Sequence, residues 1–178
     1  MRRTDFPNYK TGGGHRRKSL VFSLAVAATF LLMGRAPADS GDAWSTVAPS
    51  GAEFTVLMPG DPEEHTATIP TSVGSTVMHI YLLHDGSKFY SVSYCDYPST
   101  SALFDAQAAL CGARDGALRK AENAVVLRDV DFTFQGFPAK GIVLQLWGGQ
   151  YIYRCRMYLV GTRLYQMVFA APPSLAHA

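Results

Sequence analysis

Two glycine-containing turns within residues 137–169 constrain the fold of this chain more than any other feature of its sequence. Gly148-Gly149 suits a two-residue type I′ hairpin turn, because both central positions of that turn have positive φ. Gly161-Thr162, with glycine first, suits a type II′ turn. The segment is therefore predicted to form three consecutive antiparallel strands, and the turns fix which residues lie opposite one another.

Counting back from each turn assigns the residues of these strands to two faces, since side chains alternate along a strand. The first turn places Ile142 opposite Cys155, and the second places Cys155 opposite Val168. The two counts, made independently, agree on an inner face that is almost wholly apolar. Its members in the middle strand are Cys155, Met157 and Leu159.

The opposite, outer face combines arginines with large apolar side chains, which is unusual for a face that meets only water. Arg154 falls opposite Phe169 and Arg156 opposite Met167, so the arginine stems can lie along apolar neighbours. One interpretation is an exposed aromatic face, and the other is that something covers it. We predict an interaction patch on this face, made of Trp147, Tyr158, Tyr165, Met167, Phe169, Arg154 and Arg156.

Residues 1–38 have the pattern of a secretory signal peptide. Three basic residues, 16–18, precede an apolar run over 20–33, which is short for a membrane span of about 20 residues. Ala36-Pro37-Ala38 then supplies the small residues of a signal peptidase site. We expect a secreted or periplasmic protein whose single domain is 39–178, with an uncleaved N-terminal anchor as the alternative.

Removing residues 1–38 changes the sign of the net charge, which is +2 for the whole chain. Seven of the 16 Lys and Arg and one of the 14 Asp and Glu lie in 1–38, leaving 9 basic against 13 acidic groups. A nucleic-acid partner requires a basic face and is therefore not expected. Residues 39–178 have the length of one domain and contain no repeat or long linker.

The rest of the chain reads as further strands and one helix. Strands are predicted over 44–47, 53–58, 66–69, 77–83, 88–94 and 123–134. In the strand 88–94 we expect Tyr90, Val92 and Tyr94 to form the buried face. Asp61, Glu63 and Glu64 are expected to lie in a solvated loop.

The helix is predicted after Pro98-Ser99-Thr100-Ser101, whose hydroxyls would cap it. Its apolar stripe is expected to pack against the inner face and consists of Leu103, Phe104, Leu110, Cys111, Ala117 and Leu118. The predicted fold class is α+β, a mostly antiparallel twisted sheet with one main helix packed on one face.

Three groups of residues suggest a family. Met58-Pro59-Gly60-Asp61-Pro62, Gly136-Phe137-Pro138, and the stretch 156–165 look like landmarks of small exported bacterial domains of the PsbP/Mog-like fold. The resemblance covers most of 44–169. It implies helices on both faces of the sheet and a C-terminal helix after the last strand. Residues 170–178 contain two prolines and are too few for that helix, so we expect a poorly covered outer face, which is either a docking surface or a sign that the chain is truncated.

The sequence contains no motif that indicates catalysis, and neither a metal nor another cofactor is expected. Histidines 65, 79, 84 and 177 lack metal-ligand spacing, and His79 and His84 should lie on opposite faces of one strand. Cys111 and Cys155 should lie on facing surfaces, which leaves two alternatives, a disulfide or two buried thiols. Cys95, at a strand end, is then free or paired elsewhere.

We therefore expect an exported, non-enzymatic binding or accessory module with an unknown protein partner in the cell envelope. A membrane partner is expected only if residues 1–38 stay attached. The PsbP/Mog-like resemblance implies the same, because members of known role, such as the extrinsic subunit of photosystem II, are accessory proteins. The alternative is a small ligand-binding or hydrolytic domain with a cavity between sheet and helix, which a pocket with convergent titratable groups would favour.

Overall fold

The computed structural model describes residues 44–71, 74–98, 104–121 and 123–176, so the predicted signal peptide lies outside the described residues. Within them the chain forms a seven-stranded antiparallel sheet and one α-helix, α2 (Ala106–Lys120), which confirms the predicted α+β class. The sheet order is β3-β4-β5-β9-β8-β7-β6. The strands are β3 (Glu63–Thr71), β4 (Gly74–Asp85), β5 (Lys88–Asp96), β6 (Val125–Phe134), β7 (Phe137–Leu146), β8 (Tyr151–Val160) and β9 (Arg163–Ala171).

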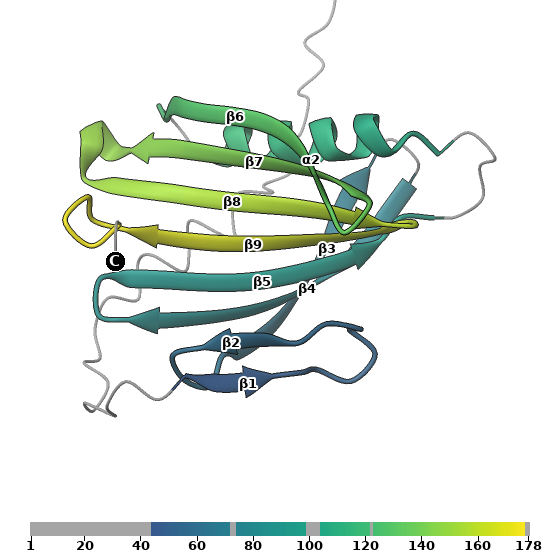
Figure 1. The fold of residues 1–178 in the computed structure, drawn as a ribbon, viewed down its shortest axis with the longest axis horizontal. Helices are drawn as coiled ribbons and strands as arrows, with labels where there is room; N and C mark the ends of the chain where they lie inside the picture. Colours follow the sequence, from purple (N-terminus) through teal and green to yellow (C-terminus); the bar gives the residue numbers. More distant parts are fainter. Residues whose placement is uncertain (1–43, 72–73, 99–103, 122, 177–178) are drawn as a thin grey trace, which may run out of the picture.

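Two meanders of strands meet in the middle of this sheet. β3, β4 and β5 form the first, and β6 to β9 form the second, which starts at the opposite edge and runs back towards β5. In the chain α2 follows β5 and precedes β6, and Figure 1 shows it behind β6 and β7. It packs on the face of the sheet formed by β7 and β8. Pairing of β9 with β5, for example Tyr165 opposite Tyr94, joins the two halves.

Both predicted hairpin registers are confirmed. Ile142 lies opposite Cys155 and Cys155 opposite Val168, as the two counts required. Gly148 and Gly149 have φ of 65° and 98°, the values of a type I′ turn, and Gly161 has φ of 60° at the first position of its turn.

The inner face is buried beneath α2, as predicted. Leu110 of the helix, Leu144 of β7 and Met157 of β8 are each 0% exposed and belong to one hydrophobic core. Cys155 and Leu159 are 1% exposed in the same core. Side chains of this size, packed to complete burial, fill the interface between helix and sheet.

The predicted start of the helix was wrong. Asp105 is the N-cap, and its carboxylate accepts hydrogen bonds from the backbone N–H groups of Gln107 (2.8 Å) and Ala108 (3.1 Å). These bonds satisfy two of the donors that a helix start leaves unpaired. Residues 99–103, which include the predicted capping residues Ser99 to Ser101 and Leu103 of the stripe, lie outside the described residues.

A second, two-stranded sheet is formed by β1 (Ser45–Val47) and β2 (Val56–Met58). The loop between these strands lies on the outer face of the main sheet, where Ala52 is 0% exposed and forms a core with Tyr81 and Tyr94. β2 is shorter than the strand predicted over 53–58. The left-handed φ of Glu53, 56°, is incompatible with a strand at that position.

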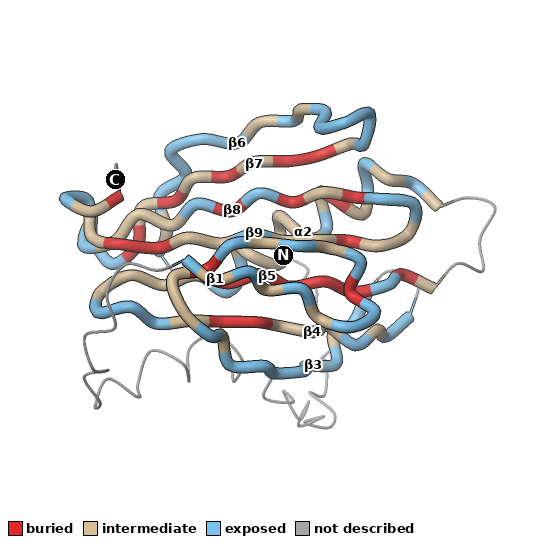
Figure 2. Tube along the Cα trace, turned by 60° about the horizontal axis from the view of Figure 1, so that its bottom comes forward, coloured by how far each residue is buried: buried red, intermediate tan, exposed pale blue. Residues whose placement is uncertain are grey.

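Strand β5 departs from its predicted burial because it is covered on both sides. Val92 and Tyr94 are buried as expected, and so are Ser91, Ser93 and Cys95 on the opposite face. β5 lies inside the sheet, between β4 and β9, whereas the edge strands β3 and β6 are mostly exposed (Figure 2).

The prediction of a solvated acidic loop over 61–64 was wrong in part. Glu63 and Glu64 begin β3, where they pair with Leu82 and Tyr81 of β4. The Tyr81 hydroxyl donates a hydrogen bond to Glu64 Oε1 at 3.1 Å. An edge strand tolerates charged residues, since one side of it meets water.

Candidate functional site

The strand register places six of the seven predicted patch residues on the outer face. Arg154 pairs with Phe169, Arg156 with Met167 and Tyr158 with Tyr165, across β8 and β9. These pairs alternate with the buried inner-face pairs, so their side chains project away from α2.

Trp147 does not continue this row. It leaves the strand with a φ of 49° and begins the three-residue turn η1 (Trp147–Gly149). Its ring lies 5.3 Å from the ring of Tyr151, which pairs with the buried Leu146 of the inner face. The alternation rule does not extend to a residue with left-handed backbone, which is why the count misplaced it.

The chain itself covers part of the predicted patch. Phe54, in the loop between β1 and β2, packs edge-on against three tyrosines, at 6.0 Å from Tyr165, 6.1 Å from Tyr94 and 6.2 Å from Tyr81. The Tyr165 hydroxyl donates to the carbonyl of Ala52 at 3.2 Å. We call Gly51–Phe54 the strap.

Arg163 fastens the strap to the sheet. Its Nε and Nη2 donate to the two carboxylate oxygens of Asp96 at 2.6 and 2.8 Å, and its Nη1 reaches the Gly51 carbonyl (3.0 Å) and Glu53 (3.2 Å). Its guanidinium carbon also lies 5.1 Å from the centre of the Tyr94 ring. The hydrogen bonds from Arg163 hold the pKa of Asp96 below its ordinary value.

The rest of the outer face is open among the described residues and carries three arginines. Arg128 and Arg154 flank Val143 on neighbouring strands, and Arg156 lies two residues beyond Arg154. From the spacing of strands, the Cα atoms of Arg128 and Arg154 are about 10 Å apart. All three side chains are exposed and none forms an ion pair with another described residue; we call them the arginine face.

Apolar side chains border the arginine face. Met167 is 41% exposed beside Arg156, and an aromatic cluster lies nearer the turn between β6 and β7. In this cluster the ring of Tyr158 lies 5.9 Å from Phe132 and 5.3 Å from Phe134, and Phe134 is 50% exposed. Arginine beside exposed aromatic and methionine side chains is the composition typical of protein interfaces.

The carboxylates of β6 lie on the other face, beneath α2. Asp129 pairs with Arg114 of the helix at 2.7 Å, and Asp131 pairs with the buried Lys140 at 2.6 Å. The hydrogen bond that Lys140 donates to Asp131 raises the pKa of Lys140, and the same bond lowers the pKa of Asp131. These ion pairs connect α2, β6 and β7. Both carboxylates of strand β6 are therefore paired with cations on the inner face.

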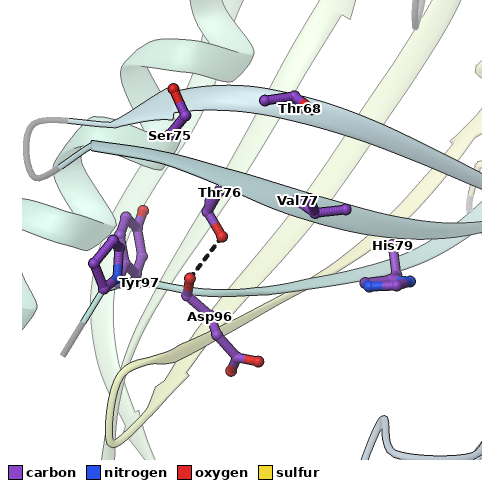
Figure 3. A pocket seen from close by; sticks show the side chains of 8 residues that line it. Thr68, Ser75, Thr76, Val77, His79, Asp96 and Tyr97 are labelled. Carbon is purple, nitrogen blue, oxygen red and sulfur yellow. Dashed lines mark hydrogen bonds between the residues drawn. The ribbon is translucent and has the colours of Figure 1, made fainter.

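A shallow groove of about 580 Å³ lies at the far end of the sheet, where β3, β4 and β5 meet. Figure 3 shows His79, Thr76 and Tyr97 around it, with the Thr76 hydroxyl donating to the backbone oxygen of Asp96 at 2.6 Å. His79 stacks on Tyr94 at 4.8 Å. The Asp96 carboxylate points away from Thr76 and is bound by Arg163, so the groove does not present a free acid–base pair.

The three cysteines are free thiols, so the structure contains no disulfide between Cys111 and Cys155. Leu110, Ala113 and Ala117 lie on the side of α2 that meets the core, and Cys111 is about 100° around the helix from Leu110. Cys111 is partly buried, whereas Cys155 is 1% exposed. Burial raises the pKa of Cys95 to about 11 and of Cys155 to about 12.

Sequence reasoning missed Arg128, although a signal for it was present. Gln135 and Gly136 have φ of 52° and 84°, so they form a two-residue turn that pairs Phe134 with Phe137. Counting back from that pair puts Arg128 opposite Val143, before the irregularity between Val126 and Arg128 breaks the count. The counts made from Gly148-Gly149 and Gly161-Thr162 do not extend to this strand.

In the described part of the chain, no group of three or more His, Cys, Asp or Glu is placed to hold a metal ion. No described helix combines the length and apolar character needed to span a bilayer.

Comparisons with known proteins add little. No protein-family model matches the chain, and no curated protein matches it. Among solved structures it is similar to PA94, a protein of unknown function from Pseudomonas aeruginosa, with 12% identity over 74% of this chain and 84% of that chain. The TM-score of 0.39 is too low for this likeness to carry an argument about fold or function.

Proposed function

We propose that this chain is an exported, non-catalytic binding module that docks a protein partner on the outer face of β6 to β9. The observation that carries the proposal is the contrast between the two faces. The inner face is filled by α2, with Leu110, Leu144 and Met157 each 0% exposed, whereas the arginine face and Met167 are open among the described residues. A protein that bound its ligand between sheet and helix would need space there instead.

The alternative, a ligand-binding or hydrolytic domain, has weaker support. The groove beside His79 lies at the far end of the sheet and not between sheet and helix, and its one carboxylate, Asp96, is held by Arg163. Export is proposed from residues 1–38 alone. The PsbP/Mog-like assignment remains a proposal too, supported at the level of architecture by an antiparallel sheet with a helix on one face.

Site-specific photo-crosslinking in the producing cells tests the docking face. A benzophenone amino acid would replace Met167 on the outer face of the full chain, with Lys120 at the exposed end of α2 as the control position. We expect one protein to crosslink from Met167 and not from Lys120. After identification and purification, that protein should bind the wild-type chain and bind a Met167→Glu variant more weakly.

The same crosslinked products from both positions would overturn the docking face, as would a purified product that does not bind. Export is tested separately by the mass of the chain recovered from outside the cytoplasm. The expected mass is that of a chain starting near Asp39, and recovery of the chain only from the cytoplasm would contradict export.

A further inference from the structure

We infer that the partner presents an acidic protein surface, whose carboxylates pair with Arg128, Arg154 and Arg156. This inference rests on the proposed function, because it names the chemistry of the partner at the same face.

Charge is segregated across the sheet. The acidic residues of β6 to β9 are Asp129 and Asp131, and the register places both on the inner face. The outer face of these strands therefore carries arginine and no carboxylate. Residues 39–178 contain 13 acidic against 9 basic groups, so this cationic area lies on a domain of opposite net charge.

The stems of two arginines have apolar support. Arg154 lies opposite Phe169 and Arg156 opposite Met167, so the alkyl chains can rest on these side chains while the guanidinium groups reach outwards. Guanidinium groups bind carboxylates through two parallel hydrogen bonds, which makes arginine a frequent residue of interface hot spots. Arginines with no ion pair among the described residues are available for this pairing.

The number and surroundings of the arginines favour a protein over the other polyanions. Polybasic membrane sites contain about four to eight cations, and DNA-binding proteins commonly contact about six to ten phosphates. Three arginines on a net-negative domain fall short of both. Exposed Met167 and Phe134 beside them match the mixed apolar and arginine composition of a protein interface.

Immobilised poly-L-glutamate is the probe for this chemistry, with vesicles of phosphatidylglycerol and a DNA duplex as the competing arms. We expect the exported chain, recovered without residues 1–38 and their seven basic side chains, to bind poly-L-glutamate at low salt and to elute as salt rises. An Arg154→Ala/Arg156→Ala variant should bind about tenfold more weakly. The matched control, Arg119→Ala/Lys120→Ala, removes the same charge from the exposed end of α2 and should change binding less than about twofold.

An Arg154→Lys/Arg156→Lys variant keeps the charge but lacks the planar guanidinium fork. Its affinity for poly-L-glutamate should therefore lie between those of the wild-type chain and the Arg154→Ala/Arg156→Ala variant. Circular dichroism of each variant checks that the fold is intact. Equal losses in the test and control variants would overturn the inference, as would stronger binding to the vesicles or the DNA. If the chain does not bind poly-L-glutamate but Met167 still crosslinks to one protein, the docking face is supported and the acidic character of the partner is rejected.

Discussion

Arg163 and Asp96, 67 residues apart in the chain, form a bidentate ion pair at 2.6 and 2.8 Å. The same guanidinium bonds the Gly51 carbonyl and Glu53, so one side chain connects β9, β5 and the strap. Arginine suits this position because its five donors lie in a fixed plane.

Replacing Asp96 by Asn should lower the free energy of unfolding by about 1 kcal/mol at neutral pH, because the partner of Arg163 loses its charge. The pKa of Asp96 is lowered in the folded protein, so its stabilisation is present above the ordinary aspartate pKa and is lost as pH falls through the folded value. The difference between wild type and variant should therefore shrink below about pH 4. Urea unfolding at neutral and acidic pH measures it, and a difference that stays constant would contradict the assignment.

Replacing Phe54 by Ala should lower the free energy of unfolding by about 2 kcal/mol, since the ring packs against three tyrosines. Urea unfolding measures the change. Leu57→Ala is the control, because Leu57 is 57% exposed on the adjacent strand and its loss should have an effect within about 0.5 kcal/mol. Equal effects at both positions would mean that the strap is not anchored through Phe54.

Lys140 is 6% exposed, and its replacement by Met should reduce the free energy of unfolding by about 2 kcal/mol at neutral pH. The change leaves Asp129 and Asp131 without their shared cation. The raised pKa of Lys140 means that its stabilisation is present below the ordinary lysine pKa and is lost as pH rises through the folded value. Thermal and urea unfolding, with the exposed Lys120→Met as control, test the difference; a stable Lys140→Met variant would refute it.

Thiol reactivity should distinguish the three cysteines. At about pH 8 the thiols of Cys95 and Cys155 are protonated and buried, with pKa values of about 11 and about 12. Cys111 is partly exposed on α2. We expect one cysteine to be alkylated in the native protein and three after unfolding without reductant, measured by mass. Fewer than three alkylated cysteines in the unfolded, unreduced protein would indicate a disulfide instead.

The sequence predicted the fold where turn geometry was local and failed where contacts were long-range. Gly148-Gly149 and Gly161 set the register of three strands, since positive φ at a hairpin turn leaves few alternatives. The left-handed φ of Trp147 overrode the alternation that placed it in the patch.

Nothing local in the sequence indicated that the strap would reach Tyr165 or that β9 would pair with β5. These contacts join segments more than 60 residues apart, and hydrophobic periodicity carries no information about them. The candidate site was predicted in part for the same reason: Arg154 and Arg156 follow from the hairpin count, whereas the covering of Tyr165 requires the tertiary structure.

The ribosome synthesises β9 long after its partner β5, and this order has a consequence for folding in the cell. During synthesis β5 emerges with one side unpaired and keeps it so for 67 residues, from Asp96 to Arg163. An apolar strand with an unsatisfied backbone is a template for pairing with another nascent chain. A holding chaperone would therefore protect this molecule most between the emergence of β5 and the completion of β9.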